Sequence, residues 1–159
     1  MAHLRGLTSL TSLNLETTAI TDEGMRHLQD LTHLEDLNLF FTQVGDGGLV
    51  HLKGLKKLKH LSLWLTNVTN SGLVNLEGLT NLLTLDLQST AITDVGLRHL
   101  QGLKNLRKLN LQDTHVTDAG LLHLSPLKNL RSLNVANTKV SEAGVQAIRQ
   151  ALPMLEVIR

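Results

Sequence analysis

Leucines recur along the chain with a constant spacing of 24 residues. Each unit opens with a leucine that is followed by apolar residues three, six and eight positions later, as at Leu31, Leu34, Leu37 and Leu39. A fixed period of this length is typical of equal units that stack into a solenoid. Six units span residues 7–150, and their opening residues are Leu7, Leu31, Leu55, Leu79, Leu103 and Leu127.

Two shorter periodicities alternate within each unit. Leu37, Asn38 and Leu39 alternate apolar and polar side chains, which predicts a half-buried strand. Leu49, Leu52 and Leu55 then lie three positions apart, which predicts a short helix with one buried face. Strands that alternate with helices in this way predict the α/β class with a parallel sheet.

Small and polar residues repeat between strand and helix. A threonine column lies where its hydroxyls can bond the backbone as the chain leaves the sheet: Thr18, Thr42, Thr66, Thr90, Thr114 and Thr138. The predicted helix N-caps, each followed by an acid or amide, are Thr21, Thr69, Thr93, Thr117 and Ser141. A close approach of the helix start to the neighbouring unit is predicted at Gly24, Gly48, Gly72, Gly96, Gly120 and Gly144. A left-handed residue that ends the helix is expected at Gly54, Gly78 and Gly102.

The unit from Leu79 to Gly102 fits the pattern LxxLxxLxLxxTxITDxGLxxLxG at every defined position. This pattern resembles the leucine-rich repeat family, and within it the 24-residue type with the TxITDxGL motif, which is related to the cysteine-containing and bacterial types. The resemblance covers essentially the whole chain. It implies a right-handed β-α solenoid with a parallel sheet on the concave face and short helices on the convex face. It also implies protein recognition, with partners that differ from member to member.

The repeat accounts for residues 1–159 as a single domain. Residues 1–6 match the end of a unit and are expected to be the tail of a preceding turn, and residues 7–150 form the six repeats. Residues 151–159 are expected to form a truncated repeat or cap, in which Leu152, Leu155 and Ile158 restart the pattern one residue late. Edge strands near Leu13 and Ile158 could pair with another molecule, which leaves a homodimer open.

Composition and charge argue against several classes of partner. The net charge is +1, from 15 basic and 14 acidic residues, so no strong field attracts nucleic acid or anionic lipid. The chain has no cysteine and therefore no disulfide, thiol nucleophile or cysteine-bound zinc. No apolar run is long enough to span a bilayer, and the first residues lack the apolar core of a signal peptide. These features favour a cytoplasmic setting and predict no nucleic-acid partner, no membrane partner and no cofactor.

The aromatic residues give the most specific functional signal. Hydrophobic residues make up 42% of the chain but aromatics only 2%, and Phe40, Phe41 and Trp64 all fall in outward columns of adjacent units. The core does not need them, and we expect about half of each ring to be exposed on the concave face, extended by Leu65. Phe41 and Leu65 could instead simply cover the rim of the sheet. The predicted partner-binding set is completed by four flanking residues, Glu16, Asp36, His60 and Gln88.

The distribution of charge along this face adds a direction to the prediction. Acidic residues flank the aromatic residues, whereas Arg107, Lys108 and Arg131 lie toward the other end, so a partner with an apolar knob and a basic group would fit. The asparagine-rich column that includes Asn14, Asn38, Asn110 and Asn134 is interpreted as a row of short solvent-facing side chains.

Chemistry was sought in two further patterns. A histidine column on the helical side contains no recurring carboxylate or third ligand, and is interpreted as structural: His3, His27, His51, His99 and His123. Asp36 and His60 are neighbours with Ser12 as the nearest hydroxyl, but an open surface without a pocket or oxyanion donor does not support a catalytic triad. The sequence therefore predicts neither a metal site nor an enzyme.

Three functional hypotheses follow from the pattern. The leading one is a non-catalytic protein-protein interaction module that binds a protein or peptide through its concave face. The second is a structural or self-associating segment of a larger protein, acting as a spacer or homodimer. The third is the substrate-recognition arm of a ubiquitin-ligase-type receptor, which rests on analogy with relatives alone.

Overall fold

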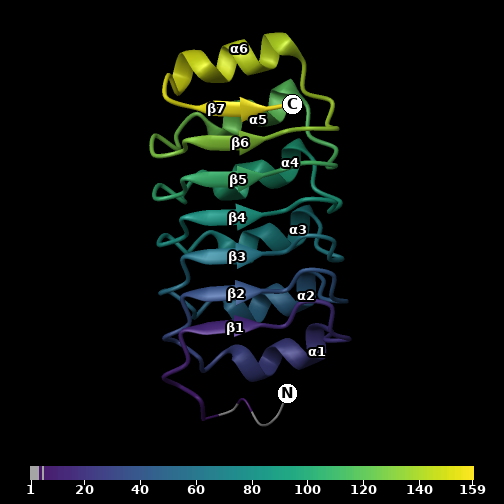
Figure 1. The fold of residues 1–159 in the computed structure, drawn as a ribbon, viewed down its shortest axis with the longest axis vertical. Helices are drawn as coiled ribbons and strands as arrows, with labels where there is room; N and C mark the ends of the chain where they lie inside the picture. The colour runs from purple at the N-terminus through teal and green to yellow at the C-terminus, as the bar shows by residue number, and fades with distance from the viewer. Residues whose placement is uncertain (1–3, 5) are drawn as a thin grey trace.

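The chain forms a column of stacked turns, each with a strand on one side and a helical segment on the other (Figure 1). The computed structural model describes residue 4 and residues 6–159. Over this range one parallel sheet holds seven strands in chain order: β1 (Ser12–Asn14), β2 (Asp36–Asn38), β3 (His60–Ser62), β4 (Thr84–Asp86), β5 (Lys108–Asn110), β6 (Ser132–Asn134) and β7 (Glu156–Ile158). Most of the predicted tail of a preceding turn, including His3, lies outside the described residues.

The register of the sheet repeats the period of the sequence. Every strand residue pairs with the residue 24 positions later, from Ser12 with Asp36 to Ser132 with Glu156. Columns in the aligned sequence are therefore columns in space, which places equivalent leucines directly above one another. The predicted α/β class, parallel sheet and solenoid are confirmed.

The helical side is built from very short segments. Four-residue helices form α1 (Asp22–Met25), α2 (Asp46–Leu49), α3 (Asn70–Leu73), α4 (Asp94–Leu97) and α5 (Asp118–Leu121). A 3₁₀ turn follows each of them, namely η2 (Arg26–Leu28), η3 (Val50–Leu52), η4 (Val74–Leu76), η5 (Arg98–Leu100) and η6 (Leu122–Leu124). Three residues per turn align side chains three positions apart, so Leu49, Leu52 and Leu55 all reach the core with no exposed surface. None of the helices in the described part of the chain is long and apolar enough to cross a bilayer.

The predicted caps are confirmed at four of five positions. The hydroxyls of Thr69, Thr93, Thr117 and Ser141 accept a hydrogen bond from a backbone N–H of the first helical turn, whereas Thr21 accepts none. The threonine column also behaves as predicted, because each hydroxyl donates to the carbonyl three residues earlier, as from Thr90 to Leu87 at 2.5 Å.

The acids that follow the caps join one turn to the next. Asp94 accepts hydrogen bonds from both the backbone N–H and the hydroxyl of Thr117, at 2.8 and 2.7 Å. The side chains at this position lie against the helix-start glycines of the next turn at Gly48, Gly72, Gly96, Gly120 and Gly144. A Cβ on Gly120 would collide with Asp94, which confirms the predicted close approach.

The expectation of left-handed glycines at the helix ends is wrong. Of the described glycines, Gly6 alone has a positive φ. The 3₁₀ turns end in right-handed residues, and the chain bends back toward the sheet without a left-handed step. The left-handed corner lies on the opposite side, where each strand ends, and is occupied by Thr17, Phe41, Leu65, Ser89, Asp113 and Asn137.

The two ends of the solenoid differ. At the first turn Leu7 is 48% exposed, because none of the described residues covers it. At the last turn a continuous ten-residue helix, α6 (Glu142–Ala151), covers the core (Figure 1). The predicted one-residue delay holds for the buried Leu152 and Leu155, but it is wrong for the strand. β7 returns to the 24-residue register, so Val157 lies opposite Leu133 and Ile158 is 54% exposed.

Candidate functional site

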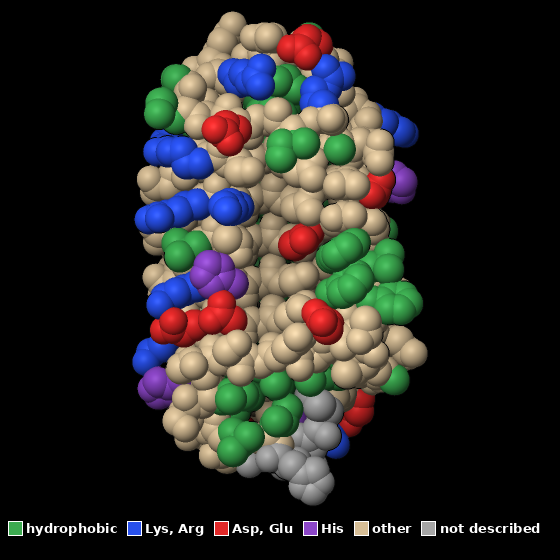
Figure 2. Space-filling model, in the orientation of Figure 1, with side chains coloured by type: hydrophobic (Ala, Val, Ile, Leu, Met, Phe, Trp, Pro, Cys, Tyr) green, Lys and Arg blue, Asp and Glu red, His purple; other side chains and the backbone are tan. Residues whose placement is uncertain are grey.

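The outward side chains of β1–β6 line an open groove along the sheet, which we call the strand face (Figure 2). Its walls are polar, because serine, threonine, asparagine and charged residues alternate with the buried leucines. Asp36, His60 and Lys108 belong to the lining of this groove.

The asparagine column has a structural task beyond facing solvent. The side-chain oxygen of Asn38 accepts a hydrogen bond from the backbone N–H of Phe40 at 3.0 Å, which turns the chain out of the strand. Asn14, Asp86, Asn110 and Asn134 make the same local bond with the residue two positions later. The interpretation as a simple solvent row is therefore incomplete.

The same asparagines form a ladder between turns. The side-chain amide of Asn38 donates to Glu16 at 2.6 Å, that of Asn110 donates to Gln88 at 3.1 Å, and that of Asn134 donates to Gln112 at 3.1 Å. The two partners are always 22 residues apart. Two of the predicted site residues, Glu16 and Gln88, are members of this amide ladder and have their polar ends engaged within it.

Aromatic rings replace the ladder in the second and third units. Phe40 and Trp64 occupy the positions that Glu16 and Gln88 hold in the neighbouring units. Their rings stack with centroids 4.1 Å apart and planes inclined by 23°, and Phe41 lies 6.1 Å from Phe40. We call Phe40, Phe41, Trp64 and Leu65 the aromatic cluster.

The aromatic cluster lies outside the leucine core. None of its members belongs to the buried core, as the sequence predicts. Phe41 is 58% and Leu65 is 42% exposed, but Phe40 and Trp64 are half-buried because they cover one another. The expectation that half of every ring is exposed therefore holds for Phe41 and is too high for the stacked pair. Hydrophobic side chains gather at one edge of the groove in Figure 2.

Phe41 and Leu65 have an unusual backbone for their side chains. Their φ angles are 52° and 54°, in the left-handed region that short polar residues tolerate best. The later units place Ser89, Asp113 and Asn137 at this corner. Phe41 and Leu65 also line a second groove, together with the threonines beside the sheet.

Asp36 and His60 lie together at the start of their strands. The Nε2 atom of His60 is 3.9 Å from a carboxylate oxygen of Asp36, and its Nδ1 atom is 2.8 Å from the hydroxyl of Thr84. The hydroxyl beside the histidine is thus Thr84 and not Ser12, which pairs with Asp36 from the other side. The side chains of Asp36 and His60 are about half exposed on an open surface.

Two carboxylates of this face have shifted pKa values. The hydrogen bond from Lys59, at 2.7 Å, lowers the pKa of Glu35. Burial raises the pKa of Asp86, and this effect outweighs the hydrogen bonds that Asp86 accepts. Within the described part of the chain Asp86 has no ion-pair partner. Asp86 is not among the residues predicted for the site, although an acid in a column of asparagines is a signal visible in the sequence.

The histidine column shows no common chemistry. His99 bonds Glu77 at 2.6 Å and His123 bonds Gln101 at 3.0 Å, so members of the column have different partners. Among the residues that the structure describes, no group of three or more acids and histidines is placed to hold a metal ion.

Sequence comparisons agree with the stacked strands and helices described above. A leucine rich repeat profile matches residues 56–116, a second one, for two copies of the repeat, matches residues 104–145, and a third matches residues 6–28 and 30–52. The chain belongs to the leucine-rich repeat family, whose members typically act as protein-interaction modules. No curated protein matches the sequence at a significant level.

Solved structures share this fold. An internalin (InlF) of Listeria monocytogenes superposes with a TM-score of 0.78 at 21% identity, over 99% of this chain and 43% of the internalin. Internalin C2 (InlC2) of the same organism gives a TM-score of 0.70 at 28% identity, over 95% of this chain and 71% of its own. The chain therefore spans less than half the length of the first of these proteins.

Proposed function

We propose that the chain is a non-catalytic interaction module that binds a protein or peptide through its strand face. The aromatic cluster is the centre of the binding surface, and Glu16, Asp36, His60 and Gln88 surround it. The observation that carries this proposal is that Phe40, Phe41 and Trp64, the aromatic residues of the chain, all lie together outside the core. Aromatic side chains with polar surroundings are typical centres of binding energy in protein interfaces.

The equivalent positions of neighbouring units show which side chains the fold itself requires at the aromatic cluster. Neighbouring units show that a hydrogen-bonding glutamate or glutamine satisfies the position of Phe40 and Trp64. They also show that a short polar residue satisfies the left-handed corner of Phe41 and Leu65. The fold requires no aromatic side chain at these positions, and exposing one forgoes hydrophobic burial. Binding of a partner explains why the four bulky apolar side chains at these two positions all occur in two adjacent units.

Site-specific photocross-linking tests the proposal. The photoreactive residue p-benzoylphenylalanine is placed at Phe41 in one variant and at Leu122, which is 64% exposed on the helical side, in the control. Under the proposal, a discrete cross-linked species forms from position 41 and not from position 122. The double substitution Phe40→Gln and Trp64→Gln should abolish that species. Equal labelling from both positions, or labelling that persists without the rings, would reject the strand face as the binding surface.

Self-association is the second candidate, and the exposed first turn favours it. Leu7 is 48% exposed, and Leu10, Leu13 and Leu15 are only partly buried beside the free edge of β1. Sedimentation equilibrium separates the two modes. A dimer that Leu7→Ser dissociates assigns association to the end of the solenoid, whereas one that Trp64→Gln dissociates assigns it to the aromatic cluster.

A further inference from the structure

The interrupted amide ladder leaves the carboxylate of Asp86, which has no ion-pair partner among the described residues, at the ladder position that follows Trp64. In the intact parts of the ladder, a glutamate or glutamine side chain reaches the asparagine 22 residues later. The same spacing relates Trp64 to Asp86. A glutamine at this position could donate to the carboxylate of Asp86 from an amide with two N–H groups, whereas the indole of Trp64 has a single N–H donor. Asp86 therefore occupies, in the next unit, the position at which the ladder partner of Trp64 would lie.

We infer that Trp64 and Asp86 form a subsite for the guanidinium group of an arginine side chain on the partner. The inference rests on the proposed function and deepens it by naming the chemistry that the surface recognises. The guanidinium plane and its aliphatic stem pack on the stacked rings, and its N–H groups donate to Asp86. Arginine fits better than lysine, because its planar group stacks on aromatic faces and pairs with a carboxylate through two parallel hydrogen bonds.

Charge and burial on this face support the assignment. Asp86 is half-buried in the groove and accepts the backbone N–H of Gln88 at 3.0 Å, so its side chain is held in place. Glu35 forms an ion pair with Lys59, and a carboxylate oxygen of Asp36 lies 3.9 Å from the ring of His60, whereas Asp86 has no ion-pair partner among the described residues. Lys108, two positions earlier on the adjacent strand, makes no ion pair with Asp86. A cation from a partner would supply the missing charge and lower the raised pKa of Asp86.

The position of Asp86 allows a substitution that preserves the fold. Asn14, Asn38, Asn110 and Asn134 occupy the same slot in other units and make the same bond to the backbone. Asp86→Asn therefore removes the charge and keeps the local turn. Asp113→Asn is the matched control, because it removes a carboxylate that follows β5 and lies outside the proposed binding set, and Asn137 shows that the same left-handed corner accepts an asparagine.

Binding is measured on the intact chain with acetyl-arginine amide as the probe and acetyl-citrulline amide as its neutral isostere. The readout is the indole N–H resonance of Trp64, the single tryptophan. The inference predicts a saturable shift with the arginine probe and affinity at least tenfold weaker for the citrulline probe. It also predicts an equal loss in Asp86→Asn and little change in Asp113→Asn. A carbon-detected titration should show the pKa of Asp86 falling when the arginine probe is bound.

Several results would overturn the inference. They are no saturable shift with the arginine probe, equal binding of the citrulline probe, and full binding by Asp86→Asn. Tighter binding of Nα-acetyl-lysine amide, whose side-chain amine is free, than of the arginine probe would also reject arginine as the occupant. Cross-linking from Phe41 would still succeed in these cases if the aromatic cluster binds a partner by apolar contact. Failure of the arginine subsite is therefore distinguishable from failure of the proposed function.

Discussion

Two consecutive residues, Leu63 and Trp64, offer a direct test of which side chains hold the fold. Leu63 points into the core and has no exposed surface, whereas Trp64 stacks on Phe40 outside the core. The substitutions Leu63→Ala and Trp64→Gln alter opposite sides of the same segment. We expect the smaller chemical deletion to cause the larger loss of stability.

The expected free energies follow from what each side chain contacts. Leu63→Ala leaves a cavity among leucines that cannot collapse in a stacked core, which costs about 2–5 kcal/mol of unfolding free energy. Trp64→Gln removes the stack with Phe40, worth about 0.5–1.5 kcal/mol, together with some partly buried ring surface. The glutamine amide can donate to Asp86 and offset part of this loss. The net cost of Trp64→Gln is therefore about 1 kcal/mol.

Urea unfolding followed by far-ultraviolet circular dichroism measures both variants against the parent chain. The midpoint should move clearly for Leu63→Ala and slightly for Trp64→Gln, with similar slopes for both. A loss for Trp64→Gln that equals or exceeds the loss for Leu63→Ala would refute the reasoning. The ring would then be a structural element, and the central argument for a binding surface would fail.

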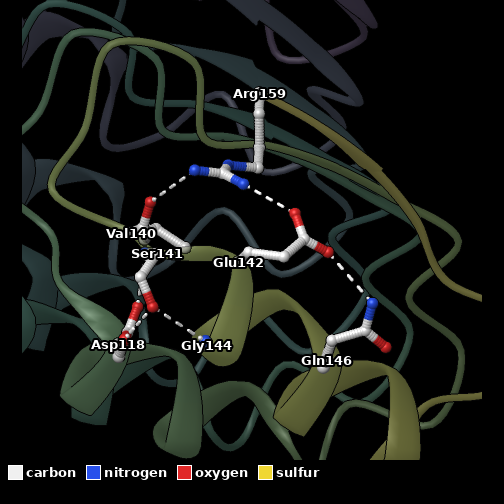
Figure 3. A network of polar contacts seen from close by, with 7 residues as sticks. All are labelled: Asp118, Val140, Ser141, Glu142, Gly144, Gln146 and Arg159. Carbon is white, nitrogen blue, oxygen red and sulfur yellow. Dashed lines mark hydrogen bonds and ion pairs between the residues drawn. The ribbon is translucent and has the colours of Figure 1, made fainter.

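Three further predictions concern the repeat and its charges. Gly120→Ala forces a Cβ against Asp94 and should lower the free energy of unfolding by about 1–3 kcal/mol. Gly102→Ala is the control, because the nearest atom to its Cβ would be a carbonyl oxygen at 3.6 Å, and thermal unfolding should show it to be neutral or slightly stabilising. Hydrogen bonds from Ser141 lower the pKa of Asp118 (Figure 3). The contribution of ionised Asp118 to folding stability is therefore present above pH 3.8 and is lost as the pH falls through the lowered pKa. Amide hydrogen exchange in α6 should accelerate over that fall in pH. Burial raises the pKa of Asp86 above 3.8, so ionisation of this group lowers the folding stability as the pH rises from 3.8 through the raised pKa. At pH 7 the denaturant midpoint of Asp86→Asn should therefore equal or exceed that of the parent chain.

Most of the fold could be predicted because each unit solves the same packing problem. The leucine columns, the threonine bonds and the helix-start glycines are all local or involve the next unit at a fixed offset. The mistake at Gly54, Gly78 and Gly102 has a specific cause. Glycine after a helix usually indicates a left-handed end, but the 3₁₀ turns here continue with right-handed residues, and the left-handed corner lies after the strand.

The end of the chain shows a second limit of periodic reasoning. Leu152 and Leu155 shift by one residue because α6 is a continuous helix, while backbone pairing with β6 restores the original register in β7. Val157 rather than Ile158 therefore occupies the inward slot. Spacing alone could not separate the helix from the strand at this point, because the two elements obey different constraints. The network at the same end, in which Arg159 bonds Glu142 at 2.7 Å, equally depends on the tertiary structure (Figure 3).

The candidate site was predictable in its residues but not in its contacts. The outward column gave Phe40 and Trp64, yet their mutual stacking and reduced exposure depend on ring orientations that a sequence does not determine. Glu16 and Gln88 were expected as free flanking groups, but they belong to the amide ladder, which requires side chains of two units to meet. Asp86 gained significance only when that ladder showed what normally occupies its position.

A solenoid with a constant register makes departures from its own pattern informative. In an irregular protein an exposed phenylalanine has no internal reference, whereas here the other units show what the same backbone position accepts. Three separate slots depart from their columns in units two to four: aromatic rings replace ladder residues at Phe40 and Trp64, bulky apolar residues take the left-handed corner at Phe41 and Leu65, and Asp86 replaces an asparagine. Each departure costs something that the neighbouring units avoid, through exposure, backbone strain or burial of a charge. A partner that contacts all three slots accounts for their occurrence in neighbouring units.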